Sequence, residues 1–154
     1  MRLAFDTSVL VAALVEPHPL HNRALPWLDA VREKRASGEC SVHALAETWS
    51  VLTRLPIDPA IAPAMATVAL ERVAEILQPV EIDVDAYWSA IRRCSERGVR
   101  SGALFDALHL VVAESNGADV LVTFNPGDFL RLTTQDSPVI VVPPDPPGCD
   151  LSVL

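Results

Sequence analysis

The segment Ser101–Phe129, SGALFDALHLVVAESNGADVLVTFNPGDF, contains a helical pattern, a tight turn and a short apolar run in direct succession. Its apolar residues recur at i, i+3, i+4, i+7 and i+8, the spacing of a buried helical stripe: Leu104, Ala107, Leu108, Val111 and Val112. Ser101 is the expected N-cap of this helix, and Asn116-Gly117 supplies the left-handed turn that ends it. The segment predicts an amphipathic helix that leads into a buried strand.

One acidic residue lies inside this predicted helix. Asp106 falls about one turn from its start, beside the apolar stripe rather than opposite it. A carboxylate in that position costs free energy unless a positive group meets it. The strand Val120–Thr123 follows the helix, and the loop after the strand carries Asn125 and Asp128.

The rest of the chain continues the alternation of strands and helices. Short apolar runs predict strands at Arg2–Phe5, Glu39–Val42, Val80–Ile82 and Val139–Val142. Helical spacing and capping residues predict helices at Ser8–Val15, His21–Arg35, His43–Leu55, Pro59–Leu77 and Ala86–Arg97. Such alternation is typical of a parallel sheet with both faces covered. We expect an α/β fold, a three-layer α/β/α sandwich around a five-stranded parallel sheet.

Length and composition limit the classes of protein. The 154 residues predict one domain over residues 1–143, followed by a loosely held proline-rich tail over residues 144–154. No apolar run approaches the roughly 18 residues of a membrane span, so we expect a soluble, cytoplasmic protein with no membrane association. The net charge of −8 argues against tight non-specific binding to nucleic acid, but it allows a nuclease whose bound cation changes the local charge.

Several acids are predicted at one edge of the sheet, where the carboxyl ends of parallel strands lie together. Asp6 ends the first strand, and Glu47 and Asp106 lie in the first turns of two helices. Carboxylates gathered there would repel one another, and a divalent cation would remove the conflict. Hard oxygen ligands favour Mg²⁺ or Mn²⁺ over Zn²⁺. Hydroxyls that could hydrogen-bond to the carboxylates or to metal-bound water are those of Thr7, Ser8 and Thr123.

Each acid also has a structural interpretation. Asp6 could cap the following helix, and Glu47 could be a solvated carboxylate favoured by the helix dipole. Asp128 could cap a short helical turn, and Asn125 is a common turn residue in Asn-Pro-Gly. Asp106 has the weakest such alternative because it borders the buried stripe.

Basic residues and one histidine lie near Asp106 in the sequence. Arg93, Arg97 and Arg100 follow helical spacing and could guide phosphates to a metal, or they could form a solvated face that pairs with a nearby acid. His109 is three residues after Asp106. We expect it to be a histidine at the core edge, hydrogen-bonded to a neighbour, rather than a catalytic group.

Taken together, these motifs resemble the PIN domain, in particular the ribonuclease toxins of the VapC type. The matching pieces are Phe5–Leu10, Ala46-Glu47 with Val51–Pro56, Phe105–Leu108, Gly117–Thr123, Asn125 and Asp128-Phe129. The order and spacing of these pieces are specific, although each piece alone is weak. The resemblance spans roughly residues 3–143 and implies a five-stranded α/β/α fold.

The resemblance also implies an activity: Mg²⁺- or Mn²⁺-dependent endoribonuclease cleavage by the toxin of a type II toxin–antitoxin pair. Asp6, Glu47 and Asp106 match the three central acids of the family, with Asp6 and Asp106 as the expected direct ligands. The family often has a fourth acid where this chain has Asn125, so a second metal would depend on Asp128. The resemblance further implies a cognate antitoxin and a homodimer.

Two other classes of function remain open at this point. The first is a non-catalytic interaction module with the same fold that binds a protein partner. The second is a phosphatase with an aspartyl nucleophile after the first strand. That chemistry requires a second Asp two residues later, where this chain has Ser8, and no glycine-rich phosphate loop with a lysine is present.

Overall fold

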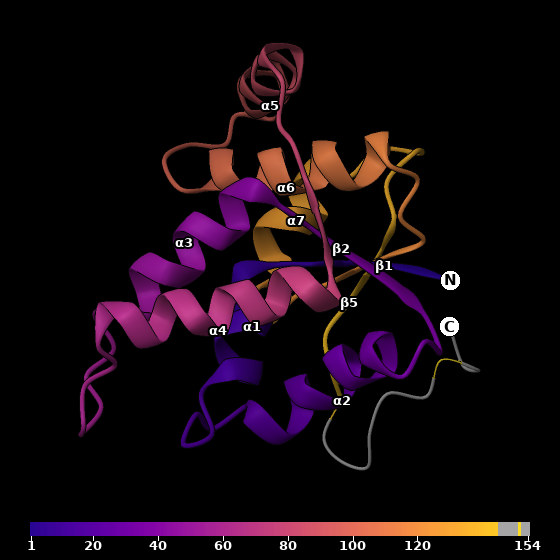
Figure 1. The fold of residues 1–154 in the computed structure, drawn as a ribbon. Coiled ribbons are helices and arrows are strands. Elements are labelled where there is room, and N and C mark those ends of the chain that lie inside the picture. The colour runs from indigo at the N-terminus through magenta and orange to yellow at the C-terminus, as the bar shows by residue number, and fades with distance from the viewer. Residues whose placement is uncertain (145–150, 152–154) are drawn as a thin grey trace.

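The computed structural model describes residues 1–144 and 151 and has the predicted architecture. The elements follow in the order β1 Arg2–Phe5, α1 Thr7–Leu14, α2 His21–Arg32, β2 Ser37–Ser41, α3 Val42–Leu52, α4 Pro63–Ile76, β3 Gln78–Val80, α5 Val84–Arg97, α6 Ala103–Ser115, β4 Val120–Val122, α7 Pro126–Leu132 and β5 Val139–Val141. All neighbouring strands pair in parallel, in the order β3-β2-β1-β4-β5. The predicted α/β/α sandwich with a five-stranded parallel sheet is therefore confirmed (Figure 1).

The strand order places β1 at the centre of the sheet. Leu3 aligns with Gly38 of β2 on one side and with Val120 of β4 on the other. The chain builds outward from β1 through β2 and β3, then crosses to the other side for β4 and β5. Ligands of open α/β sheets bind beyond the carboxyl ends of the strands where the order reverses. The ends of β1 and β4 meet at that point, where the Asp6 N–H donates to the carbonyl of Val122 at 3.1 Å.

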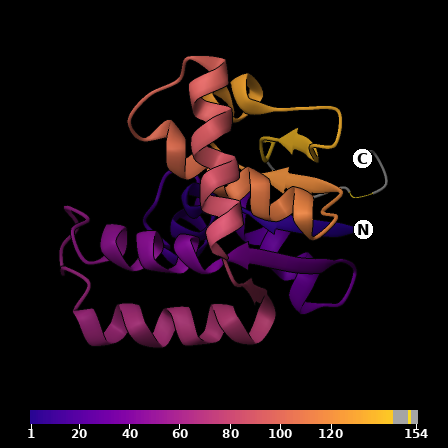
Figure 2. The same ribbon diagram turned by 90° about the horizontal axis from the view of Figure 1, so that it is seen from above.

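The two faces of the sheet are covered by different parts of the chain (Figures 1 and 2). Successive residues of a strand point to opposite faces, and β1 shows this clearly. Leu3 and Phe5 pack with helices α1 to α4, whereas Ala4 packs with α5, α6 and α7. The first half of the chain therefore builds one helical layer, and the second half builds the other.

Local sequence signals explain several of the helix ends. Ser41 caps α3 by accepting from the Ala44 N–H at 3.0 Å, and Asp83 caps α5 by accepting from the Ala86 N–H at 2.7 Å. Gly117 follows α6 with a φ of 66°, in the left-handed region that favours glycine. The predicted N-cap role of Ser101 is wrong. Ser101 has a φ of 56°, and α6 begins after Gly102 with no side-chain capping bond.

The segment after β4 is a helix, not the loop that the sequence predicted. Asn-Pro-Gly is typical of a turn, but Pro126 occupies the first turn of α7, where proline is well tolerated. Phe129 and Leu132, three residues apart, are fully buried against the second helical layer. Burial of these two side chains stabilises the helix and overrides the local turn preference.

Gly38 gives a test of the packing behind β2. A Cβ added there would lie 2.5 Å from Leu77 Cδ2 and 2.8 Å from Val31 Cγ2. We therefore expect Gly38→Ala to lower the free energy of unfolding by about 1–3 kcal/mol, measured by urea denaturation. Gly127→Ala is the matched control, since a Cβ added at Gly127 would meet no described atom within 4 Å. Equal stability of the Gly38→Ala and wild-type proteins would contradict this packing.

The end of the chain is described only in part. Leu151 packs against the core on the α1–α4 side of the sheet. The other residues of the predicted tail beyond Pro144, Cys149 among them, lie outside the described residues. Within residues 1–144 and 151, no helix has both the length and the apolar character needed to cross a membrane.

Candidate active site

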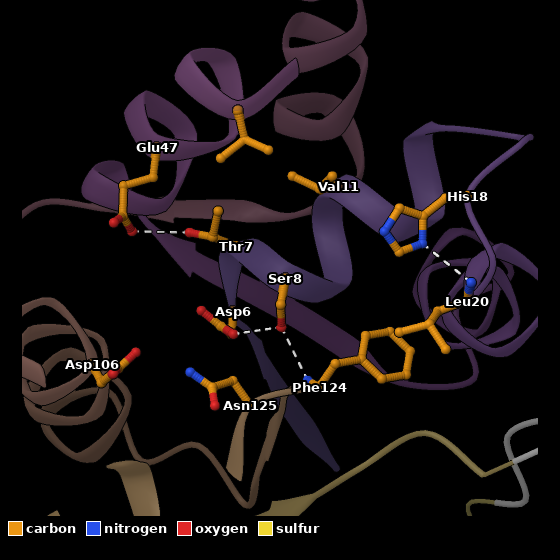
Figure 3. A pocket seen from close by; sticks show the side chains of 11 residues that line it. Asp6, Thr7, Ser8, Val11, His18, Leu20, Glu47, Asp106, Phe124 and Asn125 are labelled. Carbon is orange, nitrogen blue, oxygen red and sulfur yellow. Dashed lines mark hydrogen bonds between the residues drawn. The ribbon is translucent and has the colours of Figure 1, made fainter. Parts of the chain in front are cut away.

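A pocket of about 370 Å³ opens at the edge of the sheet where β1 and β4 end (Figure 3). Its lining combines predicted acids with residues from α1 and from the connection to α2: Asp6, Thr7, Ser8, Val11, His18, Leu20, Glu47, Val51, Asp106, Phe124 and Asn125. Glu47 comes from α3 in one helical layer and Asp106 from α6 in the other, with Asp6 between them. The structure thus brings four of the five predicted site residues to one pocket.

Asp6 is held by two hydroxyl groups. Its Oδ2 accepts from Ser8 Oγ at 2.6 Å and from Thr123 Oγ1 at 2.8 Å, and the residue is only 5% exposed. Asp6 precedes α1, but its side chain makes no capping hydrogen bond. A role as a helix cap therefore does not account for the orientation of the Asp6 side chain. The predicted hydrogen bonds from Ser8 and Thr123 to a carboxylate are confirmed.

Glu47 is held in a similar way through one oxygen. Its Oε2 accepts from Thr7 Oγ1 at 3.0 Å and lies 2.8 Å from His109 Nε2. Burial alone would raise the pKa of Glu47, but the hydrogen bond and charge of His109, with smaller contributions from Thr7 and His43, bring it below its ordinary value. Glu47 is therefore an ionised, oriented carboxylate rather than a freely solvated one.

His109 connects Glu47 to the sheet. Its Nδ1 lies 2.8 Å from Ser41 Oγ, which also accepts from the Ala44 N–H. When His109 Nδ1 accepts from the Ser41 hydroxyl, its Nε2–H donates to Glu47 Oε2. The expectation of a core-edge histidine bonded to a neighbour is confirmed, since His109 is buried and bonded at both nitrogens. It acts on the pocket through Glu47.

Among the three acids that line the pocket, Asp106 has no hydrogen-bonding partner in the described part of the chain. Within residues 1–144 and 151 no hydrogen bond or ion pair reaches its carboxyl group. Burial, then the charges of Asp6, Asp128 and Glu47, raise the pKa of Asp106 to about 7 against the opposing effect of His109. A bound cation would remove this repulsion.

The donor chemistry of the pocket fits a hard divalent cation. Asp6 and Asp106 offer carboxylate oxygens, and no cysteine lines the pocket among the described residues. In the same part of the chain, however, no group of three or more His, Cys, Asp or Glu side chains is close enough together to hold a metal as they stand. Three-carboxylate coordination would therefore need side-chain adjustment, whereas Mg²⁺ commonly binds through one or two carboxylates and water.

The two candidate residues after β4 take different positions. Asn125 is exposed and lines the pocket, and its backbone N–H donates to Thr123 Oγ1 at 2.9 Å. Asp128 lies in the first turn of α7, outside the lining, with its Oδ1 3.3 Å from Arg131. Its charge nevertheless contributes to the raised pKa of Asp106, so it lies close enough to act electrostatically.

None of the three candidate arginines is among the residues that line the pocket. Arg93 is held by two hydrogen bonds of 2.8 Å to the carboxylate of Glu114, and its side chain is only 17% exposed. Arg97 donates to the carbonyl of Thr133 at 3.0 Å. Arg100 borders a separate hollow between α5 and α6. Arg93 thus pairs with Glu114 on α6 rather than with Glu96 on its own helix. Because both terminal guanidinium nitrogens donate in this pair, fewer of its donors remain to bind phosphate.

The pocket also includes residues that sequence reasoning missed. Val11, His18, Leu20, Val51 and Phe124 form its less polar part. His18 lies in a proline-flanked turn with no recognisable spacing to the acids, so no pattern indicated it. Phe124 stands between Thr123 and Asn125, and its place directly after a central strand was the available signal.

Two known ribonucleases are similar in sequence to this chain. Ribonuclease VapC27 from Mycobacterium tuberculosis is 38% identical over 119 residues, which are 77% of this chain and 81% of that protein. Ribonuclease VapC40 from the same species is 34% identical over 119 residues, 77% of this chain and 84% of that protein.

Solved structures show the same fold at lower identity. The M. tuberculosis toxin VapC20, described as cleaving the sarcin-ricin loop, matches with a TM-score of 0.68 and 19% identity, covering 88% of this chain and 99% of that one. VapBC2 from Rickettsia felis, bound to a fragment of its promoter DNA, matches with a TM-score of 0.67 and 19% identity over 92% and 98% of the two chains. The model of the PIN domain matches residues 3–134, and the chain therefore belongs to the PIN-domain family.

Proposed function

We propose that this protein is a divalent-metal-dependent endoribonuclease and the toxin of a type II toxin–antitoxin pair. The observation that carries the proposal is Asp106, a carboxylate without a hydrogen-bonding partner in the described chain that lines the same pocket as Asp6 and Glu47. The pocket lies at the sheet edge where α/β folds bind ligands. The VapC ribonucleases among its relatives support RNA as the substrate.

The proposed metal ligands are Asp6 and Asp106, with Glu47 as a third ligand or as the residue that orients water. Oxygen ligands favour Mg²⁺ or Mn²⁺. When bound, such an ion polarises a phosphoryl oxygen and lowers the pKa of its water. Asn125, at the rim, would contact substrate or metal-bound water rather than replace an acid.

The surrounding residues fix how the carboxylates face the substrate. Ser8 and Thr123 occupy Asp6 Oδ2 and leave Oδ1 for the cation. Thr7 and His109 likewise bond to Glu47 Oε2, so Oε1, with His43 Nε2 3.9 Å away, is the oxygen that would accept a hydrogen bond from water. Asp128 contributes negative charge near Asp106 and is the candidate support for a second ion. Positioning and charge stabilisation supply most of the rate in phosphoryl transfer.

We further propose an antitoxin partner, a homodimer and a cytoplasmic location. Solved structures with this fold include VapBC-1 from Haemophilus influenzae and DNA-bound VapBC from Salmonella typhimurium. Apolar surface for partners is present on α5, where Val84 is 69% exposed and Trp88 53% exposed. An apolar hollow is also lined by Leu14 of α1, Leu52 of α3 and residues from Pro59 to Ala69 at the start of α4.

The test is cleavage of RNA by the purified protein, with the new RNA ends sequenced. Discrete new ends are expected with Mg²⁺ or Mn²⁺. They should disappear with a chelator and return when metal is restored. Comparing the two ions at equal concentration settles which one the site prefers.

A non-catalytic interaction module remains the second candidate, because the described residues contain no ready-made metal cluster. That function predicts stable binding to a protein partner and no metal-dependent ends on any RNA. Cleavage that persists in chelator would instead indicate a contaminating nuclease and would contradict the metal-dependent reaction.

A further inference from the structure

The candidate active site has a second half that the carboxylate chemistry does not use. Figure 3 shows Asp6, Glu47 and Asp106 toward one side of the pocket and His18 and Phe124 toward the other. The pocket volume of about 370 Å³ lies near the lower end of the roughly 300–1,000 Å³ typical of small-molecule sites. It has room for one nucleotide rather than a paired duplex.

His18 presents a defined hydrogen-bonding group to this half. Its Nδ1 accepts from the Leu20 N–H at 3.1 Å. In the neutral imidazole the ring proton is therefore on Nε2. The ring is half-buried and lines the pocket, so Nε2–H is a hydrogen-bond donor whose direction is fixed by the turn that holds Nδ1.

Phe124 supplies an aromatic surface in a fixed place. Its backbone N–H donates to Ser8 Oγ at 3.0 Å, and Ser8 in turn donates to Asp6 Oδ2. The ring carries the Arg23 guanidinium 5.3 Å from its centroid, and Arg23 Nε donates to the carbonyl of Pro143 at 2.9 Å. The backbone bond fixes Phe124 next to Ser8, which bonds to Asp6, and Arg23 packs over its ring.

We propose that His18, Leu20 and Phe124 form a subsite for one unpaired nucleobase next to the cleaved phosphodiester. This rests on the proposed ribonuclease function. Proteins that recognise single-stranded RNA stack splayed bases on aromatic side chains and hydrogen-bond to the base edges. Phe124 offers the stacking surface, Leu20 the apolar wall, and His18 Nε2–H a donor to a base acceptor. The chain of bonds from Phe124 through Ser8 to Asp6 keeps the base and the reacting phosphate in register.

A protein segment is the competing occupant of this half. This half of the pocket is continuous with the carboxylates, and that favours RNA as its occupant. A phosphodiester bound at the carboxylates would bring its own base within reach of His18 and Phe124. The lining is also mixed, with an imidazole donor beside apolar side chains, as base recognition requires. The experiment below separates the two occupants.

The variants can be chosen so that loss of base binding is distinguished from loss of folding. His18→Asn keeps an acceptor for the Leu20 N–H, since asparagine bonds the backbone two residues on, but it removes the ring donor. Phe124→Leu keeps apolar volume without an aromatic face, and Phe124→Tyr keeps the face. His21→Asn is the matched control, because His21 Nδ1 contacts the Ala12 carbonyl and the residue does not line the pocket.

The substrates are a single-stranded RNA spanning the mapped cut site and versions with one abasic nucleotide on either side of the cut. For wild type, one abasic position should raise KM about tenfold with little change in kcat. His18→Asn and Phe124→Leu should raise KM on the intact RNA by a similar factor. In these variants the same abasic position should raise KM only slightly further. His21→Asn and Phe124→Tyr should behave as wild type.

Additive effects of the abasic position and the variants, or an unchanged KM in both variants, would overturn the subsite. So would variants that weaken binding of the antitoxin and leave KM for RNA unchanged. The affinities of the Asp106→Asn protein for short oligoadenylate, oligocytidylate and oligouridylate measure base binding at the subsite in the absence of cleavage. If wild type cuts no RNA but oligonucleotide binding depends on His18 and Phe124, the subsite stands and the proposed reaction fails.

Discussion

Asp106→Asn is expected to abolish RNA cleavage while making the metal-free protein more stable at pH 8. Loss of a proposed metal ligand would remove several kcal/mol of charge stabilisation, which corresponds to a fall of about 1,000-fold or more in kcat/KM. The stability effect has the opposite sign because the same carboxylate is half-buried, lacks a hydrogen-bonding partner in the described chain and faces like charges.

The sign of the stability effect follows from the pKa. Burial and neighbouring acids raise the pKa of Asp106 to about 7 in the folded protein, above its ordinary 3.8. Between these two values the folded state binds more protons than the unfolded state, so the contribution of Asp106 to stability falls as pH rises. Above about pH 7 the destabilisation is complete. This group is partly exposed, so solvent screening reduces the effect. Asp106→Asn should raise the free energy of unfolding by about 1–2 kcal/mol at pH 8 and by less at pH 5.

Urea unfolding at pH 5 and pH 8, with and without Mg²⁺, measures both effects. Wild type should gain about 2.7 kcal/mol when the metal is present at 100 times its Kd, and the Asn variant should gain much less. Asp29→Asn is the matched control, because the Asp29 side chain is 25% exposed, pairs with Arg32 and does not line the pocket. A well-folded Asp106→Asn protein that still cleaves RNA, with contaminating nucleases excluded, would refute the role of Asp106.

The second large effect is expected at His109, through the orientation of Glu47. His109→Phe removes the donor 2.8 Å from Glu47 Oε2 and leaves the Ser41 hydroxyl without its partner. Groups that orient metal-site carboxylates typically contribute about 10–100-fold to activity. We expect kcat to fall by that factor with KM nearly unchanged, because His109 is buried and does not line the pocket.

His109→Gln separates orientation from packing. The glutamine amide can donate to Glu47 from nearly the same place, so this variant should recover most of the lost kcat. Steady-state cleavage kinetics of both variants, with urea unfolding to check the fold, give the measurement. If both substitutions lower kcat equally, or if Phe leaves it unchanged, then His109 does not act through Glu47.

The sequence predicted the fold because its signals were repeated and consistent. Apolar runs alternated with helical spacing along the whole chain, and the strands and layers followed from that pattern. Asp6, Glu47 and Asp106 were identifiable because parallel strands bring their carboxyl ends to one edge. The hydroxyl donors Thr7, Ser8 and Thr123 could be predicted from their positions beside these acids.

Features that depend on tertiary packing could not be predicted in the same way. The helix α7 forms because Phe129 and Leu132 are buried, and the local Asn-Pro-Gly signal does not contain that information. The Arg93–Glu114 ion pair joins residues 21 positions apart on two helices, so spacing within α5 could not reveal it. His18 reaches the pocket through the path of the α1–α2 connection, which no local propensity determines.

The arrangement of the two helical layers has a consequence for the growing polypeptide. Glu47 belongs to the layer built by the first half of the chain, and Asp106 to the layer built by the second half. A nascent chain whose early helices have docked still lacks Asp106 and so has no complete set of acids. Toxicity would then begin only after nearly the whole domain has left the ribosome, which gives a co-translated neutralising partner time to bind.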